Sequence, residues 1–252
     1  MAQSSLERFS DRVENYVKYR PDYPREIIGL LREETGFRPD SAVADIGSGT
    51  GIFARLFLEN GNRVFGVEPN EAMRRAAEDF LGDFPLFESI GGTAENTGLP
   101  DESVDFVTAA QAFHWFDLEK VRPEFKRILR KNGYIALVWN KRQLDSNSFL
   151  REYERFLLEY GTDYQKVRHE QITKDVLEQG FGIPFREAVF PNSQTFDLEG
   201  LRGRMLSSSY MPTPDNPRFD EMIKNLKMLF AEHQKNGKIQ ILYDTNIFYT
   251  QY

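Results

Sequence analysis

A glycine-rich stretch near the start of the chain has the residue types and spacing that could do chemistry. Residues 43–46 form a short, mostly apolar run, and Gly47, Gly49 and Gly51 follow at alternate positions before the amphipathic segment 52–58. This order predicts a strand, a tight loop and a helix. Glycine lets a ligand approach main-chain N–H groups, and a helix N-terminus adds unpaired donors with partial positive charge. The stretch therefore predicts a cradle for a nucleotide-type cofactor.

The spacing of the glycines narrows the class of cofactor. A dinucleotide-binding loop of the dehydrogenase kind has the pattern G-x-G-x-x-G, and its third glycine would fall at Ile52. A phosphate-binding loop needs a lysine after its last glycine, and none follows Gly51. The spacing disfavours an NAD-dependent oxidoreductase and excludes a phosphate loop.

An acid at the end of the next predicted strand supports the cofactor interpretation. The apolar segment 63–67 ends at Glu68, 17 residues after Gly51. In doubly wound sheets, an acid at this position accepts hydrogen bonds from ribose hydroxyls. A glutamate at a strand end can also be simply solvated. The preceding glycine loop favours the ribose role for Glu68.

Together these residues resemble the class I S-adenosylmethionine-dependent methyltransferases, in particular the small-molecule branch called methyltransferase type 11. Residues 45–51 match the pattern D-x-G-x-G-x-G of the first family motif, and Glu68 matches the acid of the second. The segment 111–116 resembles the branch that contains trans-aconitate methyltransferases. Other segments that match family patterns are Gly92-Thr93-Ala94-Glu95, Leu99-Pro100, residues 103–107 and residues 129–134. The last of these resembles the turn that precedes strand five in the family. The family usually has proline at Lys131 or Asn132 and glycine at Tyr134, and neither departure touches the cofactor.

The resemblance implies S-adenosylmethionine as the cofactor and S-adenosylhomocysteine as its product. Asp45 would contact the amino end of the methionine moiety, and Ala94 and Glu95 would meet the adenine edge. Met73 would pack on the adenine face or serve ordinary helix packing; both readings stay open. The residues expected to bind the cofactor are Tyr16, Arg20, Asp45, Gly47, Ser48, Gly49, Gly51, Glu68, Pro69, Met73, Ala94, Glu95 and Gln111.

The residues that would contact the methyl acceptor are less defined by motif. His114 follows the fourth predicted strand between two aromatic residues, where a base could deprotonate a hydroxyl acceptor. A structural or acceptor-contacting histidine is the alternative. The proline-broken segment 16–24 resembles a lid motif of the same branch, or is a turn whose tyrosines pack. The acceptor contacts that we expect from placement are Tyr19, Trp115, Arg142 and Tyr210.

These residues predict methyl transfer to a small molecule, at a carboxylate or hydroxyl oxygen, by in-line displacement. Such a reaction needs alignment and a desolvated pocket rather than a metal or a covalent enzyme intermediate. The three histidines are scattered and have no metal-ligand spacing. A methyltransferase fold that binds cofactor without turnover is the main alternative, and an NAD-dependent oxidoreductase is the second.

Composition agrees with a cytoplasmic enzyme that acts on small molecules. The net charge of −7 does not favour nucleic acid as a partner. The sequence has no cysteine, which fits a reducing compartment. No apolar run could span a bilayer, and the first residues lack the form of a signal peptide. We expect a monomer or a homodimer with no membrane partner.

The elements that must position these residues follow from hydrophobic periodicity. Between 41 and 140, strands and helices alternate, which predicts parallel βαβ units. We expect an α/β fold: a Rossmann-like, doubly wound, seven-stranded sheet, mostly parallel with an antiparallel edge strand, plus helical lid segments at the N-terminus and after strand five. The domains would be an N-terminal helical cap (1–40), a cofactor-binding core (41–142), and lid insertions with the last two strands (143–252).

The element bounds expected from the sequence are as follows. Strands are predicted at 42–46, 63–67, 85–89, 104–109, 134–139, 185–196 and 238–249. Helices are predicted at 5–20, 25–35, 52–60, 71–81, 118–130, 146–160, 173–180, 198–207 and 216–235.

Overall fold

A computed structural model describes residues 17–162, 164 and 173–252, and the contacts within it divide the chain into two units. Of the described residues, unit 1 comprises 17–21, 141–162, 164 and 191–244. Unit 2 comprises 22–140, 173–190 and 245–252. Most of the helix predicted at 5–20 lies outside the described residues; Val17–Tyr19 are helical.

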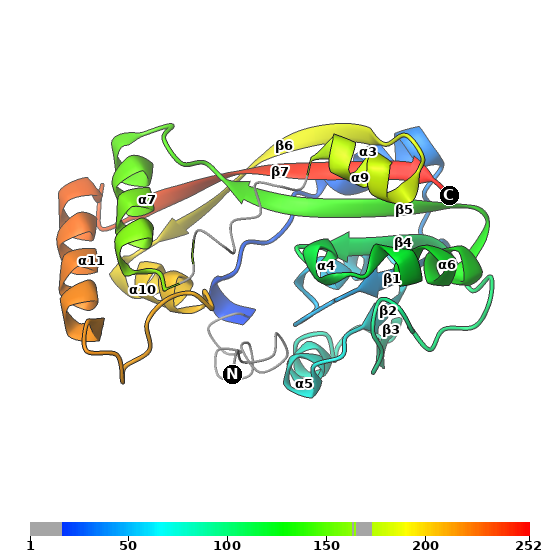
Figure 1. The fold of residues 1–252 in the computed structure, drawn as a ribbon, viewed down its shortest axis with the longest axis horizontal. Helices are drawn as coiled ribbons and strands as arrows, with labels where there is room; N and C mark the ends of the chain where they lie inside the picture. Colours follow the sequence, from blue (N-terminus) through cyan, green and yellow to red (C-terminus); the bar gives the residue numbers. More distant parts are fainter. Residues whose placement is uncertain (1–16, 163, 165–172) are drawn as a thin grey trace. The chain divides into compact units, whose positions relative to one another are not determined.

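Seven strands form one sheet in the order β3-β2-β1-β4-β5-β7-β6 (Figure 1). Their bounds are β1 Ala42–Ile46, β2 Arg63–Val67, β3 Phe87–Ile90, β4 Val104–Ala110, β5 Leu129–Arg142, β6 Arg186–Phe196 and β7 Ile239–Gln251. The pairs β1–β2, β2–β3, β1–β4 and β4–β5 are parallel. The predicted doubly wound, seven-stranded sheet is therefore confirmed.

Strand β7 runs against its neighbour β5. The amide of Gln143 donates to the carbonyl of Leu242, and the amide of Tyr252 donates to the carbonyl of Gly133. Residue numbers therefore rise along one strand as they fall along the other, which is the pattern of an antiparallel pair. This is the antiparallel strand that the sequence predicts, and it lies between β5 and the edge strand β6.

The helices lie close to their predicted positions. Unit 2 contains α3 Glu26–Thr35, α4 Ile52–Glu59, α5 Glu71–Phe80, α6 Leu118–Ile128 and α9 Lys174–Phe181, with a short 3₁₀ turn, η1, at Phe113–Trp115. Unit 1 contains α7 Ser148–Tyr160, α10 Leu198–Leu206 and α11 Phe219–His233. Helix α3 ends at residue 35, as predicted, and Gly36 adopts φ 72° and caps it.

Helices cover both faces of the sheet in unit 2. Ala42, Ala44 and Ile46 of β1 pack in one cluster with apolar residues of α6 and α9. Val43 belongs to a second cluster with residues of α3 and α4. Since successive side chains of a strand point to opposite faces, β1 is buried on both sides. Packing on both faces therefore holds the carboxyl end of β1 in place, and the glycine-rich segment begins directly after it.

Strand β5 begins five residues earlier than predicted. Leu129 pairs with Val104, whereas Tyr134 pairs with Phe106, so three extra residues of β5 bulge out between these pairs. Asn132 takes φ 64°, and a Cβ on Gly133 would lie 2.7 Å from the Leu129 side chain. The predicted turn is present, but it is a bulge inside the strand rather than a connection before it.

The core of unit 1 is built mainly from helix α7 with α10 and α11. Aromatic residues of α7 stack along the helix, with ring centroids 5.5 Å apart for Phe149–Tyr153 and 4.9 Å for Phe156–Tyr160. They share one apolar cluster with residues of α10, α11 and β7. Helices α7 and α11 lie side by side in Figure 1. None of the helices in the described part of the chain is both long and apolar enough to cross a membrane.

Candidate cofactor site

The glycine loop, residues 47–51, joins the end of β1 to the start of α4. The amides of Gly47 and Ser48 both donate to the carbonyl of Val67, at 2.8 and 3.2 Å, which ties the loop to the end of β2. The amide of Gly51 donates to the carbonyl of Ser48 at 2.9 Å and closes the turn. The loop, which continues directly from β1, is therefore fixed by backbone hydrogen bonds to β2, the strand that follows α4, and by a bond within its own turn.

The three glycines of the loop all have positive φ, but they meet different surroundings. Gly47, Gly49 and Gly51 adopt φ values of 68°, 56° and 82°. A Cβ on Gly47 would lie 2.6 Å from the Cβ of Ala112, and one on Gly51 would lie 2.5 Å from a methyl of Leu81. A Cβ on Gly49 would have no atom within 4 Å. Gly47 and Gly51 thus allow close packing of the protein, and Gly49 leaves its backbone open to a ligand.

Glu68 holds the open part of this loop. One carboxylate oxygen accepts from the amide of Gly49 at 3.0 Å, and the other accepts from the amide of Asn70 at 2.9 Å. Burial raises the pKa of Glu68, and these two amides act against that shift. Each carboxylate oxygen can accept a second hydrogen bond. Glu68 can therefore position the loop and still accept from two hydroxyl groups.

Asp45 is a buried acid near the end of β1, with 1% of its surface exposed. Its Oδ1 accepts from the hydroxyl of Thr108 at 3.2 Å, while its Oδ2 is buried and has no hydrogen-bond partner within the described structure. Burial, together with the nearby charge of Glu68, raises the pKa of Asp45 to about 7, and the hydrogen bond from Thr108 acts against this shift. A buried acceptor without a donor costs free energy, so this site suits a ligand that carries N–H groups.

Helix α5 begins directly after Glu68 and Pro69. Asn70 caps the helix by accepting from the amide of Met73 at 3.1 Å. Met73 is 4% exposed, and Pro69 is exposed. Arg74 donates to the carbonyls of Glu68 and Pro69 at 2.8 and 2.9 Å. The cap by Asn70 and the hydrogen bonds from Arg74 therefore fix the turn between β2 and α5.

Ala94 and Glu95 lie in the connection between β3 and β4. Ala94 is buried, and one carboxylate oxygen of Glu95 accepts from the amide of Asp117 at 3.0 Å. Asp117 precedes the first residue of α6, so Glu95 satisfies a donor at a helix N-terminus. This bond joins the β3–β4 connection to the start of α6.

Gln111 follows β4 and adopts φ 57°, which is uncommon for a residue with a side chain. Its amide donates to the carbonyl of Val138 at 3.0 Å, and its side chain donates to the carbonyl of Asn140 at 3.2 Å. Asn140 in turn donates to the carbonyl of Asp22 and accepts from Thr245. Strained backbone held by such a network is typical of functional sites.

His114 and Trp115 lie in the turn η1 after Gln111. Their ring centroids are 4.5 Å apart, and Trp115 is 47% exposed. Phe113 anchors the turn because its buried ring contacts Phe116 and Trp139. A large exposed aromatic residue on an anchored turn is suited to contact a ligand.

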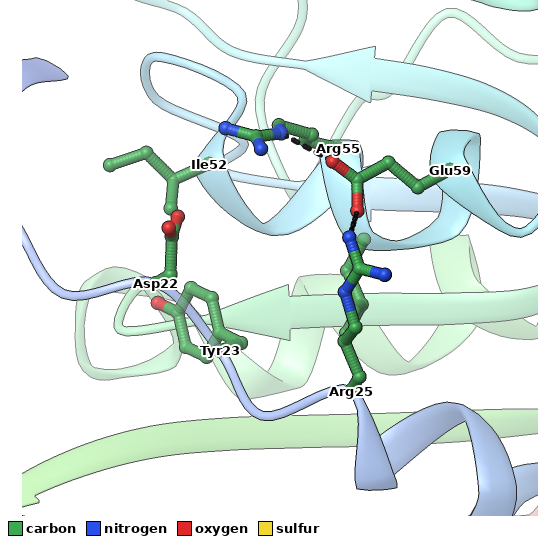
Figure 2. Close-up of a pocket in the computed structure, with 7 residues that line it drawn as sticks. Asp22, Tyr23, Arg25, Ile52, Arg55 and Glu59 are labelled. Carbon is green, nitrogen blue, oxygen red and sulfur yellow. Dashed lines mark hydrogen bonds and ion pairs between the residues drawn. The ribbon is translucent and has the colours of Figure 1, made fainter. Parts of the chain in front are cut away.

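A separate small cavity lies beside the first turn of α4 (Figure 2). It has a volume of about 110 Å³. Glu59 bonds both Arg25 and Arg55 at 2.7 Å on one side, and Asp22 and Ile52 lie on the other. Ligand pockets for drug-sized molecules measure roughly 300 Å³ or more. This cavity contains none of the predicted site residues and suits a few water molecules.

The remaining predicted residues belong to unit 1, apart from Tyr16, which lies outside the described residues. A Cβ on Gly203 would lie 2.0 Å from the ring of Tyr19, so this ring packs directly on α10. Arg20 donates to the carbonyl of Ser207 at 2.9 Å. Arg142 pairs with Glu154, and Tyr210 packs on Tyr164 with ring centroids 4.8 Å apart.

Sequence reasoning missed several residues that organise these sites. Thr108 supports Asp45, and Asn140 supports Gln111, but neither lies in a motif. The signal for Thr108 is a polar residue in the middle of an otherwise buried strand.

The sheet order, the glycine loop after β1 and the acid after β2 define a Rossmann-like domain for a nucleotide-type cofactor. Residues 44–137 match the family described as "Methyltransferase domain". This segment thus matches a methyltransferase domain, and in sequence and fold the chain is similar to S-adenosylmethionine-dependent methyltransferases.

Individual relatives agree with this assignment. An uncharacterised methyltransferase-like protein of Schizosaccharomyces pombe is 28% identical over 250 residues, which are 98% of this chain and 96% of that protein. The structure of a putative type II methyltransferase from Anaeromyxobacter dehalogenans superposes with a TM-score of 0.69 at 25% identity, covering 92% of this chain and 98% of that one. A Haemonchus contortus phosphoethanolamine N-methyltransferase 2 solved with S-adenosylmethionine shares the fold (TM-score 0.57, 15% identity, 99% of this chain and 60% of that chain).

Proposed function

We propose that unit 2 binds S-adenosylmethionine at the glycine loop and that the enzyme transfers its methyl group to an oxygen of a small molecule. The observation that carries the proposal is the open backbone at Gly49, flanked by the carboxylates of Asp45 and Glu68. The buried Oδ2 of Asp45 would accept from the amino group of the methionine moiety. Glu68 would accept from the ribose hydroxyls with the lone pairs that Gly49 and Asn70 leave unused.

The other predicted residues complete this assignment. Gly47 and Ser48 would present the loop backbone to the methionine moiety, and Ala94 with Glu95 would meet the adenine edge. Gln111 would direct its main chain to the methionine moiety from the end of β4. Main-chain groups at these positions, together with the side chains of Asp45 and Glu68, would hold the cofactor.

When bound, the cofactor supplies a methyl group on a positively charged sulfur, which keeps the bonding electron pair as the acceptor oxygen forms the new C–O bond. The protein has to align the acceptor oxygen, methyl carbon and sulfur and to exclude water from them. A carboxylate acceptor needs no base, because it already carries a lone pair and a negative charge. A hydroxyl acceptor would lose its proton, and His114 is the candidate to take it.

Calorimetric titration with S-adenosylhomocysteine tests the binding half of the proposal. We expect one site per chain, and the absence of binding by either S-adenosylhomocysteine or S-adenosylmethionine would overturn it. Transfer of a labelled methyl group to small molecules of a cell extract tests the catalytic half. We expect the label in a small molecule whose unmethylated form is an acid. If a carboxylate is the target, ester hydrolysis should release the label from the product. Tight binding without labelling of any fraction would instead identify a cofactor-binding module.

A further inference from the structure

A histidine and two glutamates from neighbouring helices of unit 1 come together in the structure. Helices α7 and α11 pack side by side (Figure 1). Glu152 lies on α7, and Glu232 and His233 are the last two residues of α11. A ring nitrogen of the histidine and one oxygen of each carboxylate all lie within 4.8 Å of one another. Glu152 and His233 are 81 residues apart, so no spacing in the sequence indicates this group.

The ring of His233 is held in one orientation by side chains of α7. Its Nε2 lies 2.9 Å from a carboxylate oxygen of Glu152, and its Nδ1 lies 3.4 Å from the hydroxyl oxygen of Ser148. These two residues are four apart and share one face of the helix. The ring also packs edge-on against Phe149, with centroids 5.9 Å apart, and the side chain is only 11% exposed. An imidazole fixed in this way is preorganised as a metal ligand.

The two carboxylates of the group have no basic side chain beside them. Among the residues that the structure describes, no lysine or arginine lies within ion-pair distance of Glu152 or Glu232. Other glutamates of α7 differ, since Glu154 pairs with Arg142 and Glu159 pairs with Arg218. Two like charges this close together repel each other. One divalent cation would balance both carboxylates and remove this repulsion.

The donor set indicates the class of cation. Carboxylate oxygens alone suit Mg²⁺ or Ca²⁺, whereas an imidazole nitrogen favours Zn²⁺ and its transition-metal neighbours. Two donors on one tetrahedral zinc ion lie about 3.3 Å apart, given bonds of about 2.0–2.1 Å. The Nε2 of His233 and the oxygen of Glu152 are already close to this separation. Glu232 is exposed and makes no hydrogen bond or ion pair with a described residue, so its side chain is free to turn toward the same point.

We propose that Glu152, Glu232 and His233 bind one divalent transition-metal ion of the zinc class, which joins α7 to α11. The ion would take the place of the proton in the hydrogen bond between Nε2 and Glu152, and water would complete the fourth position. Nδ1–H would donate to the hydroxyl of Ser148 and keep the lone pair of Nε2 directed at the ion. The site lies within unit 1 and does not depend on the proposed function.

Calorimetric titration of the whole protein with zinc chloride tests the site. We expect one site per chain. Glu232→Gln should weaken Zn²⁺ binding at least about tenfold, because it removes one ligand charge, and it should leave the fold unchanged because this side chain is exposed and unbonded among the described residues. Glu159→Gln is the matched control, since Glu159 lies on α7 in an exposed ion pair, and it should bind Zn²⁺ like the wild type. Absence of Zn²⁺ binding, or equal affinity of these two variants, would overturn the proposal.

Substitutions at the other two ligands separate metal binding from the existing hydrogen bond. Glu152→Gln keeps an oxygen that can accept from Nε2 but removes the charge, and it should weaken Zn²⁺ binding at least about tenfold. His233→Ala should weaken it further, and circular dichroism checks that this variant is folded. Wild-type affinity in Glu152→Gln would mean that the ion binds elsewhere on the protein and would overturn the assignment, whether or not His233→Ala folds.

Thermal unfolding tests whether the ion joins the two helices. Zn²⁺ at about one hundred times its Kd should raise the midpoint of unfolding by about 5 °C, because it binds an arrangement that only the packed helices provide. A chelator should reverse the rise, and Glu232→Gln should abolish it at the same Zn²⁺ concentration. Mg²⁺ should give no such rise. Equal stabilisation by Mg²⁺, or binding of Zn²⁺ without stabilisation, would overturn the proposal.

The metal site and the proposed function fail separately. S-adenosylhomocysteine should bind Glu232→Gln with wild-type affinity, because the glycine loop belongs to unit 2. Binding of Zn²⁺ without binding of S-adenosylhomocysteine would keep the metal site and overturn the cofactor assignment. The reverse result would keep the cofactor assignment and overturn the metal site.

Discussion

The glycine loop of unit 2 and the buried arginines of unit 1, Arg142 and Arg204, are held in place in opposite ways. The loop uses main-chain groups from residues that are close in sequence, and Val67, Glu68 and Gly49 fix it through hydrogen bonds. The arginines are held by side chains from α7 and β7, and these partners lie between 12 and 39 residues away from them in the sequence. One region depends on backbone conformation, and the other depends on contacts between buried side chains.

This difference determines how each site responds to change. A backbone site is lost when φ is strained or when a Cβ enters the space of the ligand. A side-chain site tolerates backbone change but depends on the number and geometry of its charged donors. Matched substitutions in the two units can therefore separate the effects on folding from those on binding.

The largest effect is expected at Gly47. Gly47→Ala places a side chain at positive φ, at a cost of about 1–2 kcal/mol, and drives its Cβ against that of Ala112, which adds about 1–3 kcal/mol. Gly49→Ala carries only the first cost, because space surrounds it. Urea denaturation should therefore show a larger loss of unfolding free energy for Gly47→Ala than for Gly49→Ala.

The same two variants also test whether the glycine loop binds the cofactor. Gly49→Ala, the more stable of the two, should lose at least about tenfold in affinity for S-adenosylhomocysteine, because its Cβ occupies the open side of the loop. If Gly49→Ala binds S-adenosylhomocysteine as the wild type does, the open backbone at Gly49 is not the cofactor contact.

Glu68→Ala should weaken S-adenosylhomocysteine binding by about 1.5–3 kcal/mol, the range of hydrogen bonds to a charged group. The substitution removes both the ribose acceptor and the bond to the amide of Gly49. Calorimetry measures the change. Glu88→Ala is the control, because Glu88 lies on the neighbouring strand β3 and forms only an exposed ion pair with Arg63. Equal affinity of the Glu68→Ala variant and this control would remove Glu68 from the ribose role.

The contrast between the sites also explains what the sequence predicts well. The strand, the loop and the acid all lie within residues 42–68, so their spacing in the sequence is enough to predict their arrangement. Strands β1 and β2 have the predicted bounds. Where local and long-range signals compete, prediction errs: Asn132 and Gly133 indicate a turn, but pairing with β4 continues β5 through them as a bulge.

In unit 1, the partners of the buried residues are distant in the sequence, and this limits what the sequence alone can predict. Arg142 and Tyr210 were expected to contact an acceptor only from their placement after strand five. Burial of Arg204 follows from the packing of α10, whose apolar residues show little helical periodicity in a sequence that contains two glycines. The burial of this arginine and its partner Tyr243 are found only once the fold brings them together.

The pH dependence of cofactor binding should follow Asp45. Its pKa in the folded protein, about 7, lies above the ordinary value of 3.8, so the folded state holds a proton that the unfolded state releases between about pH 4 and 7. The contribution of Asp45 to the free energy of unfolding is therefore greatest below pH 4, falls as pH rises to about 7, and is constant above that.

Binding of a ligand ammonium group requires the ionised carboxylate, so it costs a proton below pH 7. The affinity for S-adenosylhomocysteine should fall by up to about tenfold per pH unit below that value, or about 1.4 kcal/mol. Asp45→Asn should bind more weakly at pH 8 and lose most of this dependence. A wild-type affinity that is constant between pH 5.5 and 8 would contradict contact between Asp45 and the ammonium group.

The smallest effect compares two helix caps, one in each unit. Asn70 accepts from the amide of Met73 at the start of α5, and Asn147 accepts from the amide of Leu150 at the start of α7. Replacement of either asparagine by alanine should lower the free energy of unfolding by about 1 kcal/mol in urea denaturation. Only Asn70→Ala should also weaken S-adenosylhomocysteine binding, by a few-fold, because loss of the cap loosens the turn in which the backbone amide of residue 70 donates to the carboxylate of Glu68. Equal loss of affinity in both variants would mean that cofactor binding responds to the overall stability of the protein. It would contradict the expectation that binding depends on the local backbone around Glu68.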